Sequence, residues 1–174
     1  MADFSLAIAP LFKAEGGYVN RPDDKGGPTN LGVTQAVYRE YKHNPLADVK
    51  NITTEEATDL YKRLYWNPLL LDQVNSNRVA SLLFNQSVNR GVNAAGKLLQ
   101  RSLNALGSQL LVDGAVGPKT IAAVNLVADD RMVMRELVKA AQIAYVQIVE
   151  NDPRQLVFLE GWIRRTQEYF TQMS

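Results

Sequence analysis

The chain has 174 residues, of which 46% are hydrophobic and 21% charged, so its composition excludes a disordered or fibrous protein. Nineteen basic and 18 acidic residues are spread evenly over the two halves, which argues against a nucleic-acid-binding surface. With no cysteine and one histidine, the sequence excludes a disulfide framework and a thiolate nucleophile, and it argues against a multi-histidine metal centre or a Ser-His-Asp triad. Carboxylates remain as the catalytic groups to consider.

The N-terminal segment lacks the features of a signal peptide. It carries Asp3 where a signal peptide has basic residues, and no apolar run reaches the roughly 18 residues of a membrane span. We therefore expect no membrane span and a protein made in the cytoplasm without a signal peptide. A substrate outside the cytoplasm would then require a separate export route.

A first helix is predicted after Asp3, which can act as its N-cap. Apolar residues recur on one helical face from Phe4 to Phe12, Pro10 predicts a kink, and Glu15 ends the stripe. Partial burial disfavours the charged form of a carboxyl group, and a general acid needs this property near neutral pH. Position alone also allows the alternative that Glu15 only extends to solvent at the helix end.

Residues 16–34 contain five glycines and two prolines, which is typical of turns and allows a short hairpin. A loop of this length inside a compact domain is usually functional, although a plain surface linker stays an alternative. Asp23 and Asp24 lie in this loop, where water keeps a carboxylate ionised; for Asp23 we favour a turn role. A helix-end Glu and a loop Asp would suit glycoside hydrolysis, which uses two carboxyl groups about 5 to 9.5 Å apart.

Helical patterns fill the rest of the chain, so the predicted fold class is all-α. Thr53 and Glu56 form a capping-box signature, Asn77 can cap a helix, and Gly91 ends that helix. The predicted helices span residues 35–42, 53–65, 77–90, 94–106, 118–128, 131–150 and 153–170.

Several segments together carry a family resemblance. They are residues 15–34 (EGGYVNRPDDKGGPTNLGVT), 84–91 (FNQSVNRG), 99–107 with 112–120, and 158–165. The first two resemble the characteristic blocks of glycoside hydrolase family 108, the N-acetylmuramidases found among phage endolysins and related bacterial proteins. The pair 99–107 and 112–120 is similar to a predicted peptidoglycan-binding lobe, and residues 158–165 resemble the closing helix of the family.

The resemblance implies a lysozyme-like, mainly helical fold with a long Gly-rich active-site loop. A catalytic region, 1–90, would pack as one compact unit with a helical peptidoglycan-binding lobe, 91–174. The implied activity is hydrolysis of the β-1,4 bond between N-acetylmuramic acid and N-acetylglucosamine, with lysis of the bacterial cell wall. The resemblance implies no metal or organic cofactor. A lytic transglycosylase and a non-catalytic peptidoglycan-binding or secretion-associated protein stay open as alternatives.

The implied partners are the glycan strands of peptidoglycan and an export partner, either a holin or a secretion machine. No nucleic acid is implied, and we expect a monomer. The protein would act in the periplasm or at the cell wall after release.

The resemblance also assigns catalytic candidates. Glu15 takes the place of the family's catalytic acid. Phage-type lysozymes place eight residues between a Glu and an Asp and five more before a Thr, so Asp24 fits the second position. Asn30 occupies the Thr position, with Thr29 one residue before it and Thr34 four residues after it. The catalytic candidates are therefore Glu15, Asp24 and Thr29.

Polar side chains continue a buried helical stripe at Asn85, Gln86 and Asn89. These amides either pair with one another and with nearby backbone, or line a cleft and bind the N-acetyl and hydroxyl groups of the sugars. Tyr18 or Tyr65 could offer a ring on which a sugar stacks. The substrate-binding candidates are Tyr18, Asn20, Thr34, Asn85, Gln86 and Asn89.

Overall fold

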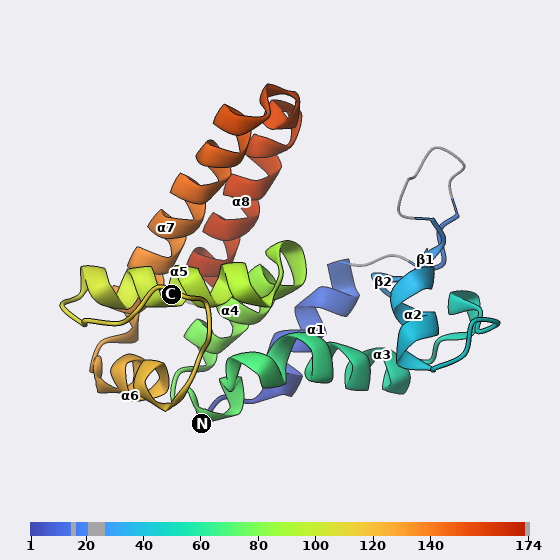
Figure 1. Cartoon of the computed structure of the whole chain (residues 1–174), viewed down its shortest axis with the longest axis horizontal. Helices are drawn as coiled ribbons and strands as arrows, with labels where there is room; N and C mark the ends of the chain where they lie inside the picture. Colours follow the sequence, from blue (N-terminus) through green and yellow to red (C-terminus); the bar gives the residue numbers. More distant parts are fainter. Residues whose placement is uncertain (15–16, 21–26, 173–174) are drawn as a thin grey trace.

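The computed structural model describes residues 1–14, 17–20 and 27–172, and over these residues it confirms the all-α prediction (Figure 1). The α-helices are α1 (Phe4–Ala14), α2 (Gln35–Tyr41), α3 (Thr54–Tyr61), α4 (Asn77–Arg90), α5 (Val92–Ala105), α6 (Pro118–Leu126), α7 (Asp130–Asn151) and α8 (Leu156–Gln172). Short helical turns are η1 (Val49–Asn51), η2 (Lys62–Trp66), η3 (Asn67–Leu69), η4 (Leu71–Gln73) and η5 (Pro153–Gln155). Strands β1 (Thr29–Asn30) and β2 (Val33–Thr34) form a two-stranded hairpin.

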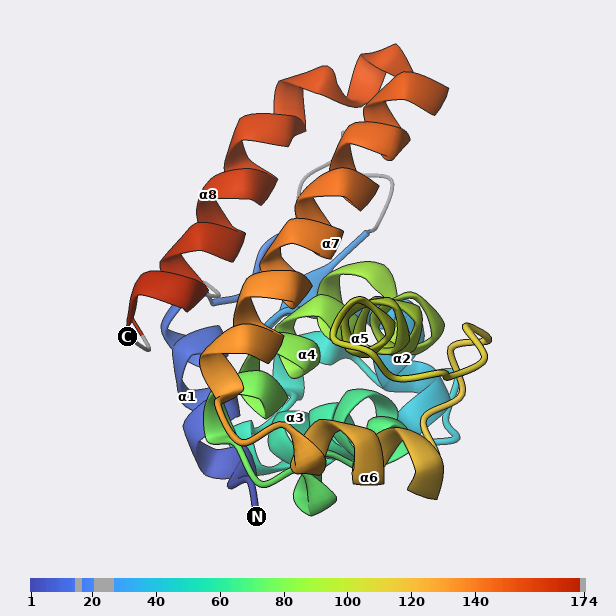
Figure 2. The same ribbon diagram turned by 90° about the vertical axis from the view of Figure 1, so that its left-hand side faces the viewer.

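Helix α4 lies at the centre of the packing. It contacts α1, α5, α7 and the π-helical turn η2, which continues α3. Helices α7 and α8 form a long antiparallel hairpin that projects from the body (Figures 1 and 2). The β1–β2 hairpin and α2 lie at one end of the molecule, and α6 lies at the other (Figure 1).

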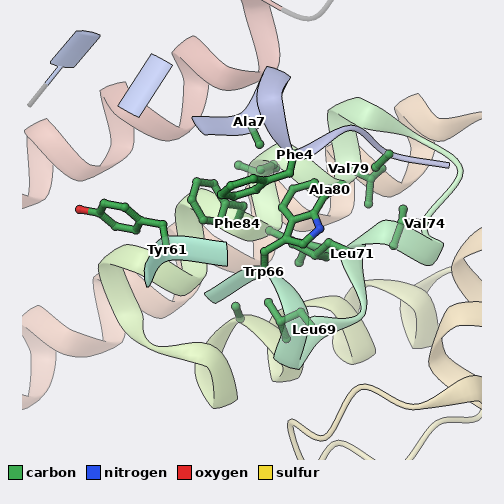
Figure 3. Close-up of a cluster of buried hydrophobic side chains, with 14 of the residues drawn as sticks. Phe4, Ala7, Tyr61, Trp66, Leu69, Leu71, Val74, Val79, Ala80 and Phe84 are labelled. Atoms are coloured by element: carbon green, nitrogen blue, oxygen red, sulfur yellow. The ribbon is translucent and has the colours of Figure 1, made fainter. Parts of the chain in front are cut away.

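Three aromatic rings fix α1 against α4 and η2. The ring of Phe4 lies 5.1 Å from Trp66 and 5.5 Å from Phe84, both edge-on, and Trp66 and Phe84 are 5.9 Å apart (Figure 3). Such edge-to-face pairs add to the free energy gained by burying the rings. Trp66 is fully buried, and its indole N–H donates a 2.8 Å hydrogen bond to Asp72. This cluster therefore anchors the helix that leads to Glu15.

Side-chain caps start the helices largely as predicted. Thr34 caps α2, and Thr53 forms the expected capping box with Glu56 at the start of α3. The predicted cap at Asn77 is wrong by one residue, because the Ser76 hydroxyl accepts the capping bond from α4. Asn77 instead accepts a 2.7 Å hydrogen bond from the backbone N–H of Asp3, so a tertiary contact has taken its side chain.

The expected short hairpin is present. Thr29 pairs with Thr34 and Asn30 with Val33, so a two-residue loop connects the strands. Both residues of this loop have left-handed backbone conformations, with φ of 50° at Leu31 and 73° at Gly32, as a type I′ hairpin turn requires.

Candidate active site

The two carboxyl candidates, Glu15 and Asp24, lie outside the described residues, and so does Asp23. The described residues show which elements precede and follow these positions along the chain. Helix α1 ends at Ala14, directly before Glu15, and the β1–β2 hairpin follows the segment that holds Asp24. The described part of the candidate site therefore consists of the end of α1, the hairpin and the C-terminal half of α4.

Tyr61 joins these three elements. Its ring lies 6.1 Å from Phe12 in the last part of α1 and 6.2 Å from Phe84 of α4. Its hydroxyl, which points away from the hydrophobic cluster in Figure 3, donates a 3.2 Å hydrogen bond to the carbonyl of Leu31 in the hairpin turn. Sequence reasoning placed Tyr61 only on an apolar helical face. The hydroxyl group of Tyr61 could have indicated this contact, because the hydroxyl of a buried tyrosine usually has a hydrogen-bond partner.

The two threonine candidates lie opposite each other in the hairpin, and both are partly exposed. The Thr29 hydroxyl donates a 3.3 Å hydrogen bond to the carbonyl of Gly27. The Thr34 oxygen accepts the capping bond from Val37, but its O–H can still donate. The structure thus brings Thr29 and Thr34 to one short hairpin.

Asn30, which occupies the threonine position of phage-type lysozymes, has a structural role. Its side-chain N–H₂ group donates hydrogen bonds of 3.3 Å and 3.1 Å to the carbonyls of Val49 and Lys50. These bonds attach the hairpin to η1. The hairpin is therefore held from one side by η1 and from the other by Tyr61.

Tyr18 and Asn20 are both exposed and flank Val19, which forms a bridge with Thr29. The ammonium of Lys50 lies 5.8 Å from the centre of the Tyr18 ring, within the range of a cation–π contact. The hairpin thus gathers the exposed Tyr18 and Asn20 and the partly exposed threonines into one group.

The three amides of α4 form a second group. Asn85 and Gln86 are buried, with exposed fractions of 6% and 1%. Asn89 donates to the backbone carbonyl of Asn85 at 2.7 Å and to its side-chain oxygen at 3.3 Å, while its own oxygen accepts a hydrogen bond from Arg165 of α8. Gln86 accepts a 3.3 Å hydrogen bond from the hydroxyl of Tyr145 in α7. Many of the hydrogen-bond donors and acceptors of these amides are therefore paired within the protein.

Two buried nitrogen atoms in the same region have no hydrogen-bond partner within the described part of the chain. They are Nε2 of Gln86 and Nη1 of Arg90. The guanidinium of Arg90 lies 5.1 Å from the centre of the Tyr145 ring, and burial lowers its pKa. Buried donors without partners are costly and uncommon in folded proteins. This end of α4 therefore has unused capacity to donate hydrogen bonds.

Tyr65 lies between the two groups. Its ring is 5.7 Å from that of Tyr61, and its backbone carbonyl accepts a 3.2 Å hydrogen bond from Ser87 of α4. Burial raises the pKa of its hydroxyl, so the group is a neutral hydrogen-bond donor over the physiological range. The hairpin group and the α4 group are thus linked through one pair of neighbouring tyrosines, whose rings are tilted by 38° to each other.

Within residues 1–14, 17–20 and 27–172, no three His, Asp or Glu side chains are grouped so that they could hold a metal ion. Over the same residues, no helix is both long enough and apolar enough to cross a lipid bilayer.

Comparisons with known proteins agree with this architecture. The family model described as "Glycosyl hydrolase 108" matches residues 8–91, and the model described as "Predicted Peptidoglycan domain" matches residues 94–167. The chain is similar to the solved structure of SagA from Brucella abortus, with 30% sequence identity and a TM-score of 0.79. That match covers 98% of this chain and 92% of the other. No curated protein matches the sequence significantly.

The first matched range contains the sequence positions of Glu15 and Asp24. It also contains the hairpin and the α4 amides, which are linked through Tyr61 and Tyr65. The second contains α5, α6, α7 and most of α8. The chain therefore belongs to glycosyl hydrolase family 108 and is a peptidoglycan hydrolase with a peptidoglycan-binding domain.

Proposed function

We propose that this hydrolase cleaves the β-1,4 bond between N-acetylmuramic acid and N-acetylglucosamine, with Glu15 as the general acid. The observation that supports this most is the junction at Tyr61, which holds the end of α1, the hairpin and α4 together. Glu15 follows α1 directly, at the end of a stripe in which Phe4, Ile8 and Leu11 are buried. An apolar setting keeps a carboxyl group protonated, so that it can give its proton to the glycosidic oxygen.

Asp24 is our candidate for the second catalytic group. It would activate the attacking water or stabilise the positive charge that develops on the sugar, and Thr29 on the adjoining hairpin would help to position that water. In glycoside hydrolases the separation of the two carboxyl groups decides whether the product retains or inverts its configuration.

The remaining candidates would bind the glycan strand. Asn20, Thr34 and the α4 amides Asn85, Gln86 and Asn89 supply donors and acceptors for N-acetyl and hydroxyl groups. Tyr18 and Tyr65 supply rings on which a sugar face can stack. The hairpin is bonded to Tyr61 through Leu31, and α4 is bonded to Tyr65 through Ser87. The two tyrosine rings lie 5.7 Å apart, which supports one continuous binding surface.

Digestion of purified sacculi by wild type and by Glu15→Gln tests this proposal. Wild type should release fragments with N-acetylmuramic acid at the reducing end, measured by mass spectrometry. The variant should be slower by about 10²-fold to 10⁴-fold, the usual contribution of general acid–base catalysis. A Glu160→Gln variant, which makes the same change on the exposed face of α8, should match wild type.

Other outcomes would point elsewhere. Near-normal digestion by Glu15→Gln would overturn the assignment of the acid. Anhydro-muramyl products would identify a lytic transglycosylase, and binding to sacculi without release of fragments would identify a non-catalytic protein.

We further propose that the enzyme acts as a monomer in the periplasm or at the cell wall, in an endolysin-like lytic role. A holin or a secretion machine would bring it there. Expression in bacterial cells tests the route: turbidity should fall only when a membrane-permeabilising partner is supplied. Lysis without that partner would contradict it.

A further inference from the structure

The peptidoglycan domain contains a pocket of about 630 Å³ between α5, the loop at 107–117 and the start of α6. Its floor includes Gln100 and Thr120, whose exposed fractions are 2% and 4%. Its rim includes the exposed side chains of Leu111, Asp113 and Lys119. A hollow with a buried polar floor and a charged rim has the form of a ligand site.

The loop that borders the pocket is held in one shape by Gln100. Its amide donates a 2.8 Å hydrogen bond to Oδ1 of Asp113 and a 3.0 Å bond to the carbonyl of Ala115, and its oxygen accepts a 2.8 Å bond from the Gly114 N–H. Asn93 donates a further 2.9 Å bond to the Asp113 carbonyl. The pocket is therefore pre-formed, which lowers the entropy cost of binding.

Asp113 gives the rim a fixed negative charge. Hydrogen bonds from the Gln100 side chain and the Ala115 backbone hold the pKa of the carboxyl below its ordinary value, so the group is ionised at neutral pH. Both bonds end on Oδ1. The second oxygen, Oδ2, is available to a cationic group of a ligand.

The start of α6 supplies the opposite charge. Its N-cap is Gly117, which has no side chain to cap the helix, and Pro118 follows without an N–H. The backbone N–H groups of Lys119 and Thr120 thus lie at the positive end of the helix dipole, and the Lys119 side chain, which also lines the pocket, adds a positive charge. The Thr120 hydroxyl lines the pocket, and among the described residues it has no hydrogen-bond partner. This donor, on a residue that is only 4% exposed, suits a carboxylate together with the backbone N–H groups.

We propose that this pocket binds the zwitterionic end of a diamino acid in the stem peptide of peptidoglycan. The ligand carboxylate would lie at the Lys119 and Thr120 donors, and the ligand ammonium would lie at Asp113. This inference rests on peptidoglycan as the substrate, as in the proposed function. It explains why the rim of the pocket carries one anionic and one cationic group above a floor that offers a hydroxyl.

Two synthetic tripeptides test the proposal with the full-length wild-type chain and isothermal titration calorimetry. One is L-Ala-γ-D-Glu-meso-diaminopimelate, whose last side chain ends in an ammonium and a carboxylate. The other is L-Ala-γ-D-Glu-L-Lys, which keeps the side-chain ammonium and lacks that carboxylate. We expect the first to bind at least about tenfold more tightly, because charged hydrogen bonds of this kind are worth at least that factor.

Variants and amide shifts locate the site. Asp113→Asn keeps an oxygen for Gln100 and Ala115 but removes the charge, and Thr120→Val removes only the free hydroxyl. Each should weaken binding of the diaminopimelate peptide several-fold, whereas Glu160→Gln on α8 should not. In nuclear magnetic resonance spectra of wild type, the amide signals of Lys119 and Thr120 should move on titration.

The proposal is overturned if the two tripeptides bind equally, if neither binds, or if Asp113→Asn binds as wild type does. The wild-type peptide comparison remains informative even if a variant folds poorly. Neither tripeptide has a glycosidic bond, so this result is independent of Glu15. Failure of the proposed hydrolysis would show only in the digestion of sacculi.

Discussion

Asn89 in the last turn of α4 accepts a hydrogen bond from Arg165 of α8, which lies 76 residues further along the chain. The first residue lies in the range matched by the hydrolase family model and the second in the range matched by the peptidoglycan domain. In the same way, the hydroxyl of Tyr145 in α7 donates a hydrogen bond to Gln86. Two of the three α4 amides that we propose for substrate binding are thus held by side chains of the other domain.

Replacing Arg165 with Ala should affect substrate binding more than stability. The Arg165–Asn89 contact is exposed, and exposed charged contacts typically contribute less than about 1 kcal/mol to the free energy of unfolding. Without Arg165, however, the side-chain oxygen of Asn89 loses its hydrogen-bond donor, and only the bonds from its N–H₂ group to Asn85 still orient the amide. We expect KM for soluble glycan fragments to rise several-fold, with little change in kcat and in Tm.

Arg164→Ala is the matched control, because Arg164 is exposed and its ion pair with Glu168 on α8 is long, at 3.8 Å. This variant should leave KM unchanged. Equal effects of the two substitutions would mean that Asn89 has no part in binding the glycan.

The Gln86–Tyr145 pair should behave as a coupled unit in unfolding experiments. Gln86→Met removes the acceptor of the buried Tyr145 hydroxyl, and an unpartnered buried hydroxyl costs about 1 to 3 kcal/mol. The double variant Gln86→Met, Tyr145→Phe removes both polar partners and also the unpartnered Nε2 of Gln86. We expect the double variant to be at least as stable as wild type towards urea.

Activity separates a structural role of this pair from a functional one. If Gln86 binds the glycan, the double variant should digest sacculi more slowly although it is stable, whereas Tyr145→Phe alone should retain most activity. Full activity of the double variant would restrict Gln86 to packing.

Local signals predicted much of this fold. Side-chain caps at Thr34 and Thr53 and the glycine at 91 mark helix ends through interactions within a few residues, and the structure has those ends. The error at Asn77 has a long-range cause, because the backbone of Asp3 recruits that side chain and leaves capping to Ser76.

The junctions between elements could not be predicted in this way. Periodicity places Tyr61 on a buried face but does not specify that its hydroxyl reaches the Leu31 carbonyl. Arg165 and Asn89 are polar residues with many potential partners, and only the tertiary fold, which brings Arg165 of α8 to the last turn of α4, selects this pair. The α4 amides were therefore identified as candidates, while the side chains that hold them were missed.

Glu56 should make stability depend on pH in the acid range. Hydrogen bonds from Lys42 and from the Thr53 backbone hold the pKa of its carboxyl below the ordinary value, with a further bond from Tyr38. A lowered folded-state pKa stabilises the protein above the unfolded pKa, which is about 4.3, and this stabilisation is lost as the pH falls through the folded value. Glu56→Gln should therefore cost about 1 kcal/mol at pH 7 and progressively less below pH ~4.

Urea unfolding of both proteins between pH 3 and pH 7 checks this dependence. Glu168→Gln, in the long exposed pair with Arg164, should change stability little at any pH. A cost of Glu56→Gln that stays constant over the whole range would show that the ionised form has no special role.

Two glycines in helices should respond to alanine in opposite directions. A Cβ atom at Gly96 in α5 would lie 2.1 Å from the carbonyl oxygen of Gly114, so the loop that borders the 630 Å³ pocket would have to move. A Cβ atom at Gly161 in α8 would have no neighbour among the described residues within 4 Å. We expect Gly96→Ala to cost about 1 to 3 kcal/mol of unfolding free energy, because the added carbon overlaps backbone. Gly161→Ala should add up to about 1 kcal/mol to the free energy of unfolding, because alanine restricts the unfolded chain more than glycine does.

Thermal unfolding measures the change in stability of both variants, and calorimetry should show weaker binding of the diaminopimelate peptide only for Gly96→Ala. A Gly96→Ala variant as stable as wild type would show that the loop can move away from α5 at little cost in free energy.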